Sequence, residues 1–170
     1  DVNDVKRLGI YKEGYENASI KINIDHHQGN DMNADYTISS PSLSSTCEIV
    51  YNLFRDDVDS QIAEYLYSGI MNDTNCFRRR ISPYTLSIVQ ELINMGINYD
   101  YIIKKTLTER SLYEFKALGK MVNDIKYDDF YYLIIDMKDE CYSDLTFNQI
   151  TKVIAEDLRT IKGMDVFVML

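Results

Sequence analysis

The sequence predicts an α/β protein with a mostly parallel sheet flanked by helices, followed by the start of a smaller mixed α/β domain. Two observations support this fold class. A strand-like apolar segment, residues 18–24, ends at Asp25 and is followed by several segments with helical periodicity. Near residue 123 the pattern changes to a hairpin and one further helix. We therefore place a domain boundary there, which divides the chain into 1–123 and 124–170.

The first part also contains one short strand, expected at 35–38. It is followed by a series of helices, expected at 43–54, 60–70, 83–96, 99–107 and 109–123. Capping signals support three of these helices. Ser45 and Glu48 have the spacing of a capping box. Asp59 is the expected N-cap of the next helix, and Ser82 followed by Pro83 is a standard helix start.

The second part begins with a hairpin at 125–135, whose turn contains Asp128 and Asp129. A helix is expected at 146–161, with Thr146 and Gln149 as its capping box. The apolar residues 166–170 predict a strand after that helix.

Composition limits the classes of function. The net charge is −9, from 18 basic and 27 acidic residues, and such a surface repels nucleic-acid polymers. A short phosphorylated substrate held by bound cations stays compatible with this charge. The three cysteines form no Cys-x-x-Cys pair, which indicates reduced thiols in a cytoplasmic protein. No apolar run is long enough to cross a bilayer, so no membrane partner is expected.

The most reactive residues lie at the end of the first predicted strand, in Asp25-His26-His27, which contains both histidines of the chain. Asp1 and Asp73 also lie near the ends of apolar segments. Carboxylate and imidazole together suit a transition metal such as manganese. Each residue also has an ordinary interpretation: a surface histidine pair, a turn or cap aspartate at 73, and a first residue without significance by itself.

The motifs resemble one known family. Asp25-His26-His27, followed by Gly-Ile-Met-Asn-Asp-Thr-Asn-Cys-Phe-Arg at 69–78, resembles the DHH family of phosphoesterases. Within it, the sequence is similar to the RecJ-like branch of short-oligoribonucleotide nucleases and phosphoadenosine-phosphate phosphatases. Residues 44–51 and 82–86 also fit this branch, and residues 1–9 resemble the family's second motif. The resemblance implies a DHH domain at 1–123 and the beginning of the associated substrate-binding domain at 124–170.

The resemblance also implies a metal site. Asp1 would bridge two manganese ions, with magnesium as an alternative, and His26 and Asp73 would bind one of the two.

Four further residues take roles from the same resemblance. Asp25 would orient the metal-binding groups, and His27 would face the scissile phosphate as a hydrogen-bond donor or proton carrier. Arg78 and Arg79 would contact substrate phosphate.

Two family elements are absent from the sequence: the first motif, a histidine and two aspartates, and a Gly-Gly-Gly-His segment. The chain also starts at Asp1 rather than at methionine. We therefore expect an internal piece of a longer protein, inactive by itself because it holds few ligands for a second ion.

The resulting functional prediction is a manganese-dependent phosphoesterase that hydrolyses short oligoribonucleotides or nucleoside bisphosphates. The alternatives are an inorganic pyrophosphatase of the same superfamily and a non-catalytic nucleotide-binding fragment. The sequence does not rank the individual substrates, and it leaves a homodimer open.

Overall fold

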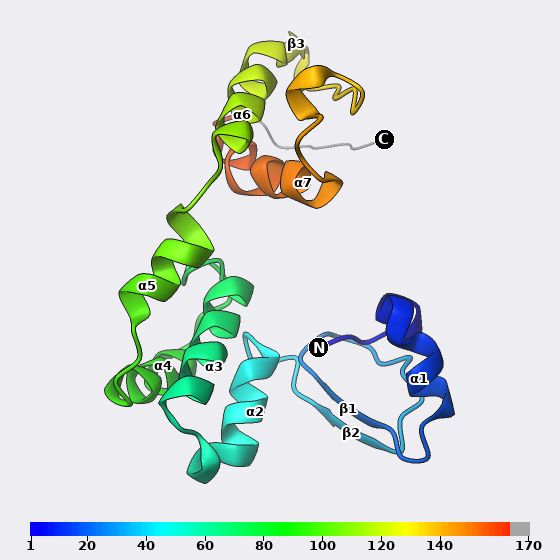
Figure 1. Ribbon diagram of the computed structural model, residues 1–170, viewed down its shortest axis with the longest axis vertical. Helices are drawn as coiled ribbons and strands as arrows, with labels where there is room; N and C mark the ends of the chain where they lie inside the picture. The colour runs from blue at the N-terminus through cyan, green and yellow to red at the C-terminus, as the bar shows by residue number, and fades with distance from the viewer. Residues whose placement is uncertain (164–170) are drawn as a thin grey trace. The chain divides into compact units, whose positions relative to one another are not determined.

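The computed structural model describes residues 1–163 and divides the chain into two compact units, Asp1–Thr108 and Glu109–Leu170 (Figure 1). The division lies before the helix at Leu112–Asp124, earlier than the expected boundary near residue 123. This helix buries Ala117 and Met121 in the core of the second unit, which explains the difference. The assignment of 1–123 and 124–170 to two DHH-type domains stays a prediction. The strand expected at 166–170 lies outside the described residues.

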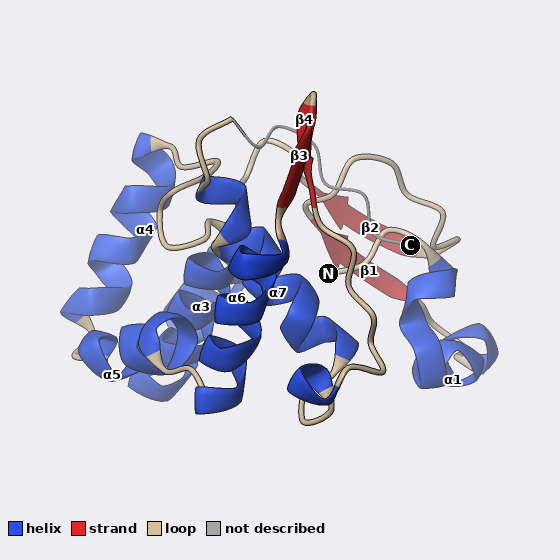
Figure 2. Cartoon of the chain, turned by 90° about the horizontal axis from the view of Figure 1, so that it is seen from above, coloured by secondary structure: helices blue, strands red, loops and turns tan. Residues whose placement is uncertain are grey.

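The first unit contains two paired strands, β1 (Ile22–Asp25) and β2 (Tyr36–Ser39). They are parallel, with Ile22 opposite Tyr36 and Asp25 opposite Ser39, and Figure 2 shows the pair in red. Both strands were expected, although β1 begins later than residue 18. The expected mostly parallel sheet is not confirmed: among residues 1–163 one pair of strands is parallel, and the other two strands form a separate antiparallel hairpin.

Two helical segments before β1 were not predicted: the 3₁₀ segment η1 (Val5–Tyr11) and α1 (Lys12–Asn17). Neither buries a residue, so this part of the sequence carries no periodic apolar signal. Asp4 caps the N-terminus of η1: its side chain accepts a hydrogen bond from the backbone N–H of Lys6, two residues later, at 2.8 Å.

The other helical segments of this unit are α2 (Thr46–Phe54), η2 (Arg55–Asp57), α3 (Ser60–Asp73), α4 (Pro83–Asn94), α5 (Tyr99–Ile103) and the π-helical η3 (Lys104–Thr108). The caps expected for α3 and α4 are confirmed: Asp59 accepts from the Ile62 N–H, and Ser82 forms a capping box with Thr85. Helix α2 begins after the extended residue Ser45 and not at residue 43. The helix expected at 99–107 is α-helical only to Ile103.

The core of the first unit lies mainly between α3 and α4. It consists of Tyr51, Ala63, Leu66, Tyr67, Ile70, Met71, Ile88, Val89, Leu92, Ile97 and Ile102. Helices α2 and α3 approach closely at Gly69, where an added Cβ would overlap the Cys47 sulfur. This packing fixes the C-terminal end of α3, which carries Asp73, relative to the N-terminal end of α2.

The second unit contains α6 (Leu112–Asp124), β3 (Lys126–Asp128), β4 (Phe130–Tyr132), η4 (Glu140–Tyr142), α7 (Phe147–Glu156) and η5 (Leu158–Thr160). The predicted hairpin is confirmed as the antiparallel β3–β4 pair. The capping box of Thr146 and Gln149 is confirmed as well, but α7 ends at Glu156 rather than near 161. No helix of the described residues is long and apolar enough to span a membrane.

Candidate metal centre

The candidate site forms where β1 ends. Asn23 and Asp25 point to the buried side of this strand, whereas Ile22 is exposed. The start of the chain runs beside the strand: the Asp1 nitrogen donates to Ile24 O at 3.2 Å, and Asn23 Nδ2 donates to Val2 O at 2.9 Å. These contacts place the Asp1 side chain next to the residues that follow β1.

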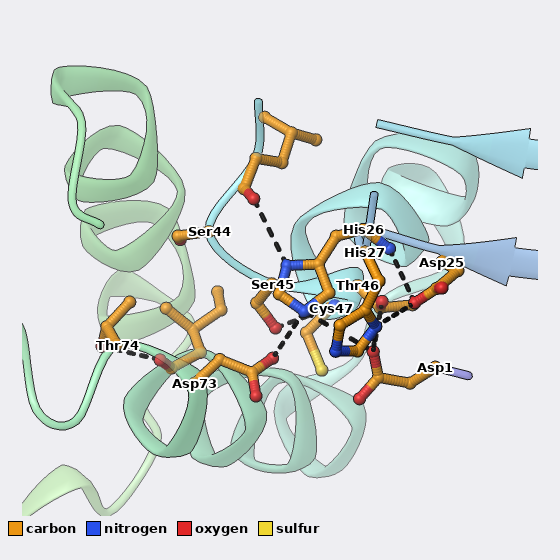
Figure 3. Close-up of polar contacts among 12 residues, drawn as sticks. Asp1, Asp25, His26, His27, Ser44, Ser45, Thr46, Cys47, Asp73 and Thr74 are labelled. Carbon is orange, nitrogen blue, oxygen red and sulfur yellow. Dashed lines mark hydrogen bonds and ion pairs between the residues drawn. The ribbon is translucent and has the colours of Figure 1, made fainter. Parts of the chain in front are cut away.

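His26 occupies the centre of the site and is 4% exposed. Its Nδ1 lies 3.3 Å from the carbonyl oxygen of Leu43. Because a carbonyl oxygen only accepts hydrogen bonds, Nδ1 carries the hydrogen in this arrangement. In the neutral ring Nε2 then carries the lone pair, and Nε2 lies 3.6 Å from Asp1 Oδ1 and 3.9 Å from Asp73 Oδ2. Figure 3 shows the ring between the two carboxylates.

The two carboxylates come from different elements. Asp73 is the last residue of α3, where the helix dipole places partial negative charge and favours a cation. Asp1 is held by Thr46, the first residue of α2, whose hydroxyl donates to Asp1 Oδ1 at 2.8 Å. Two carboxylates and a helix C-terminus thus face one imidazole nitrogen.

His27 and Asp25 form a second polar pair beside this centre. The Nδ1 of His27 lies 2.7 Å from Asp25 Oδ1, which also accepts the backbone N–H of His26 at 2.8 Å. Burial of Asp25 disfavours its charged form, but the hydrogen bonds from His27 and His26 outweigh that penalty, so its pKa lies below the ordinary value. An ionised Asp25 therefore fixes His27 with Nδ1 as the hydrogen-bond donor.

The donor set fits a divalent cation. Ions that hold ligands at about 2.0–2.1 Å separate neighbouring ligand atoms by about 3–4 Å, which is the range of the distances from His26 Nε2 to Asp1 and Asp73. Atoms of Asp1, His26 and His27 that could bind a metal also lie within 4.8 Å of one another. Mixed imidazole and carboxylate ligands suit manganese and related ions. The structure thus brings together Asp1, His26 and Asp73, and their predicted role as ligands stays a prediction.

Arg78 and Arg79 lie on the turn after α3, and both are exposed. This turn contains three consecutive residues with positive φ: Asn75, Cys76 and Phe77. The backbone N–H groups of both arginines donate to Thr74 O, at 3.0 and 2.9 Å. The turn follows Asp73 directly, and the predicted phosphate contact of the arginines stays a prediction.

Sequence reasoning missed the residues that hold the ligands in place. Thr46 and the Leu43 carbonyl contact Asp1 and His26 directly. The sequence had favoured turns and caps at 39–45, with a substrate loop as the alternative, and had placed Thr46 only within a helix. The available signal was the resemblance of residues 44–51 to the DHH branch. Cys47 lies close to the site (Figure 3), and burial raises the pKa of its thiol, which makes it a poor nucleophile.

The fold and the site together define an α/β protein with an imidazole–carboxylate cluster at the end of a strand. Residues 1–70 match the model of the DHH family, N-terminal domain. The match covers part of the chain, residues 1–70, and it confirms the resemblance to the DHH family phosphoesterases.

Similar proteins agree with this assignment. The chain is 26% identical over 129 residues to the probable bifunctional oligoribonuclease and PAP phosphatase NrnA of Streptococcus mutans, covering 74% of this chain and 37% of that protein. It is 25% identical over 124 residues to the bifunctional oligoribonuclease and PAP phosphatase NrnA of Thermus thermophilus, covering 71% and 36%. The chain thus spans little more than a third of these curated relatives.

A solved structure shows the same fold. The crystal structure of an exopolyphosphatase-related protein from Bacteroides fragilis superposes with a TM-score of 0.85 at 25% identity. The match covers 96% of this chain and 51% of that chain.

Proposed function

We propose that the protein is a manganese-dependent phosphoesterase that hydrolyses short oligoribonucleotides or nucleoside bisphosphates. One observation carries the proposal: Nε2 of the buried His26 faces the carboxylates of Asp1 and Asp73, at 3.6 and 3.9 Å. The match of residues 1–70 to the DHH N-terminal domain supports phosphoester chemistry. The names of the two NrnA relatives support the substrate class.

In this proposal His26 Nε2 and one oxygen each of Asp1 and Asp73 hold a divalent ion. The two negative charges match the charge of the ion, and the imidazole adds a neutral, directional ligand. A bound divalent ion supplies Lewis acidity, which activates water and offsets the charge of phosphate. Magnesium is the alternative ion, because carboxylate oxygens also suit it.

His27 holds or moves a proton at Nε2. Its Nδ1 is committed to Asp25, and its side chain is 33% exposed, so a substrate oxygen can reach the ring. The ionised Asp25 stabilises the imidazolium that forms when Nε2 gains a proton.

Charge and exposure agree with a small substrate. The net charge of −9 repels a long polyanion, and the exposed Arg78 and Arg79 supply local positive charge after Asp73. Reduced cysteines support a cytoplasmic location, since no disulfide joins Cys47, Cys76 and Cys141.

The test uses the full-length protein and the variant His26→Ala, with Asp56→Asn as an exposed control in η2. Manganese content and the hydrolysis of a diribonucleotide, phosphoadenosine phosphate, pyrophosphate and polyphosphate are measured side by side. We expect His26→Ala to lose manganese and turnover, and Asp56→Asn to keep both. Unchanged metal content and turnover in His26→Ala would contradict the proposal. Hydrolysis of pyrophosphate alone would favour the pyrophosphatase alternative.

A further inference from the structure

A buried carboxylate lies behind the metal centre. Glu48 is fully buried, at 0% exposure, and sits in the first turn of α2. Its Oε1 accepts a hydrogen bond from the Ser44 hydroxyl. Among the described residues its Oε2 has no hydrogen-bond partner. Burying a carboxylate with so few partners costs stability, so its presence calls for a reason other than packing.

The hydrogen bonds around Glu48 run in one direction. The Ser44 hydroxyl donates its single hydrogen to Glu48. The contact of 3.3 Å between Ser44 Oγ and Thr85 Oγ1 must then be donated by Thr85. By the same reasoning the Ser82 hydroxyl, 3.0 Å from Thr85 Oγ1, donates to Thr85. All of these groups are therefore ordered toward Glu48, and they join the start of α4 to the start of α2.

This network ends beside a contact of the metal centre. Ser44 follows Leu43, whose carbonyl oxygen lies 3.3 Å from His26 Nδ1. Ser44 is 2% exposed, and Leu43 is additionally held by its N–H, which donates to Ser40 O at 3.1 Å. Fixing the Ser44 side chain thus fixes the peptide that accepts from the imidazole.

We propose that Ser44 and Glu48 are positioning residues for His26: they hold the Leu43 carbonyl against Nδ1, which leaves Nε2 unprotonated and directed at Asp1 and Asp73. The role as a metal ligand rests on the proposed function, whereas the orientation of the ring rests on the contacts alone. A carbonyl that receives the other ring hydrogen determines the tautomer of a ligand histidine. The glutamate orders the hydroxyls that place this carbonyl.

The experiment measures the His26 tautomer and manganese binding separately. The chain has only two histidines, so ¹⁵N spectra of the ring nitrogens resolve both, and His27→Gln assigns them. Spectra of the metal-free protein are recorded at about pH 8.5, two units above the ordinary histidine pKa of about 6.5. Ser44→Ala is compared with Ser42→Ala, a change at an exposed serine of the same loop. Manganese affinity is measured by calorimetry.

We expect the wild type and Ser42→Ala to show the Nδ1–H tautomer at His26. Ser44→Ala should populate the Nε2–H tautomer and bind manganese about 10–100-fold more weakly. Glu48→Gln keeps an acceptor oxygen and should retain the tautomer, whereas Glu48→Met, of similar size, should lose it. Circular dichroism tests whether each variant is folded. If Ser44→Ala does not fold, the comparison of Glu48→Gln with Glu48→Met decides whether the network sets the tautomer.

An Nδ1–H tautomer that persists in both Ser44→Ala and Glu48→Met would overturn the inference. Failure of the proposed function gives a different result, because a wild-type protein that binds no manganese still reports its tautomer. The tautomer comparison therefore decides the positioning role in either case.

Discussion

Thr46 and Asp1, 45 positions apart, are joined by a hydrogen bond of 2.8 Å from the threonine hydroxyl to Oδ1 of the carboxylate. The same oxygen lies 3.6 Å from His26 Nε2 and 3.8 Å from His27 Nδ1. The first residue of α2 thus sets the rotamer of a carboxylate that is itself 52% exposed on its side chain.

Replacing Thr46 by Val should therefore weaken manganese binding by about 10–100-fold, the usual effect of losing a group that orients a ligand. The valine keeps the shape of the side chain and removes only the donor. Thr46→Ser keeps the hydroxyl and should stay close to the wild type. Calorimetric titration with manganese provides the measurement, and equal affinities for the two variants would rule out the orienting role.

Replacing His27 should lower turnover without loss of manganese, whereas replacing a proposed metal ligand should remove manganese. Replacing His27 by Gln removes the group that holds a proton at Nε2, so turnover should fall by about 10²–10⁴-fold. Manganese content should persist, because Asp1, His26 and Asp73 remain. Asp73→Asn should instead lose manganese, and its turnover should fall because the metal is lost. Turnover and metal content of both variants are compared, and loss of metal in His27→Gln would instead place His27 among the ligands.

Substitution by alanine should have opposite effects at two glycines, one at the close approach of α2 and α3 and one on an open face of α6. A Cβ at Gly69 would overlap the Cys47 sulfur, so Gly69→Ala should destabilise the protein by about 1–3 kcal/mol. At Gly119, in α6, an added Cβ meets no atom within 4 Å, and alanine there should stabilise by about 0.5–1 kcal/mol. Urea unfolding measures both. Cys47→Ala should rescue Gly69→Ala, and a double variant as unstable as Gly69→Ala would exclude the clash as the cause.

Acid sensitivity of the second unit should depend in part on Glu114. The backbone N–H of Ser111 donates to Glu114 and lowers the pKa of its carboxyl group. Burial opposes this effect, but the Ser111 hydroxyl also donates, and the pKa of Glu114 lies below its ordinary value. The unfolded state then binds the proton more tightly, so the stabilisation is present above the unfolded pKa of about 4.3 and is lost as pH falls through the folded pKa. Glu114→Gln should flatten the decrease in unfolding free energy below about pH 4.3. Urea unfolding at several pH values tests this, and identical pH profiles would contradict it.

Local signals predicted much of the fold. Asp59, Ser82 and Thr146 cap α3, α4 and α7 as expected, because capping depends on residues only a few positions apart. The segment 5–17 was missed because its helices bury no residue. The compact units divide before α6, because packing of Ala117 and Met121, rather than local periodicity, decides where this helix belongs. The assignment of the two domains stays a prediction.

For the site, the candidate ligands came from the resemblance, and their role as ligands stays a prediction. The DHH resemblance named Asp1, His26 and Asp73, which the fold brings together, and the structure adds their geometry. Ser44 was assigned to a turn, Glu48 to a capping box and Thr46 only to a helix. The partners of Thr46 and Ser44 that matter here, Asp1 and Thr85, lie 45 and 41 positions away in the sequence. Contacts of this length follow from tertiary packing and leave no short-range pattern.

His26 and the two carboxylates that face its Nε2 belong to three separate stretches of the chain: the end of β1, the start of the chain and the end of α3. An ion shared by them would act as a cross-link that closes two long loops at once. Metal uptake and folding of the first unit would then be thermodynamically coupled. Chelation would lower the melting temperature of this unit in addition to stopping any chemistry there.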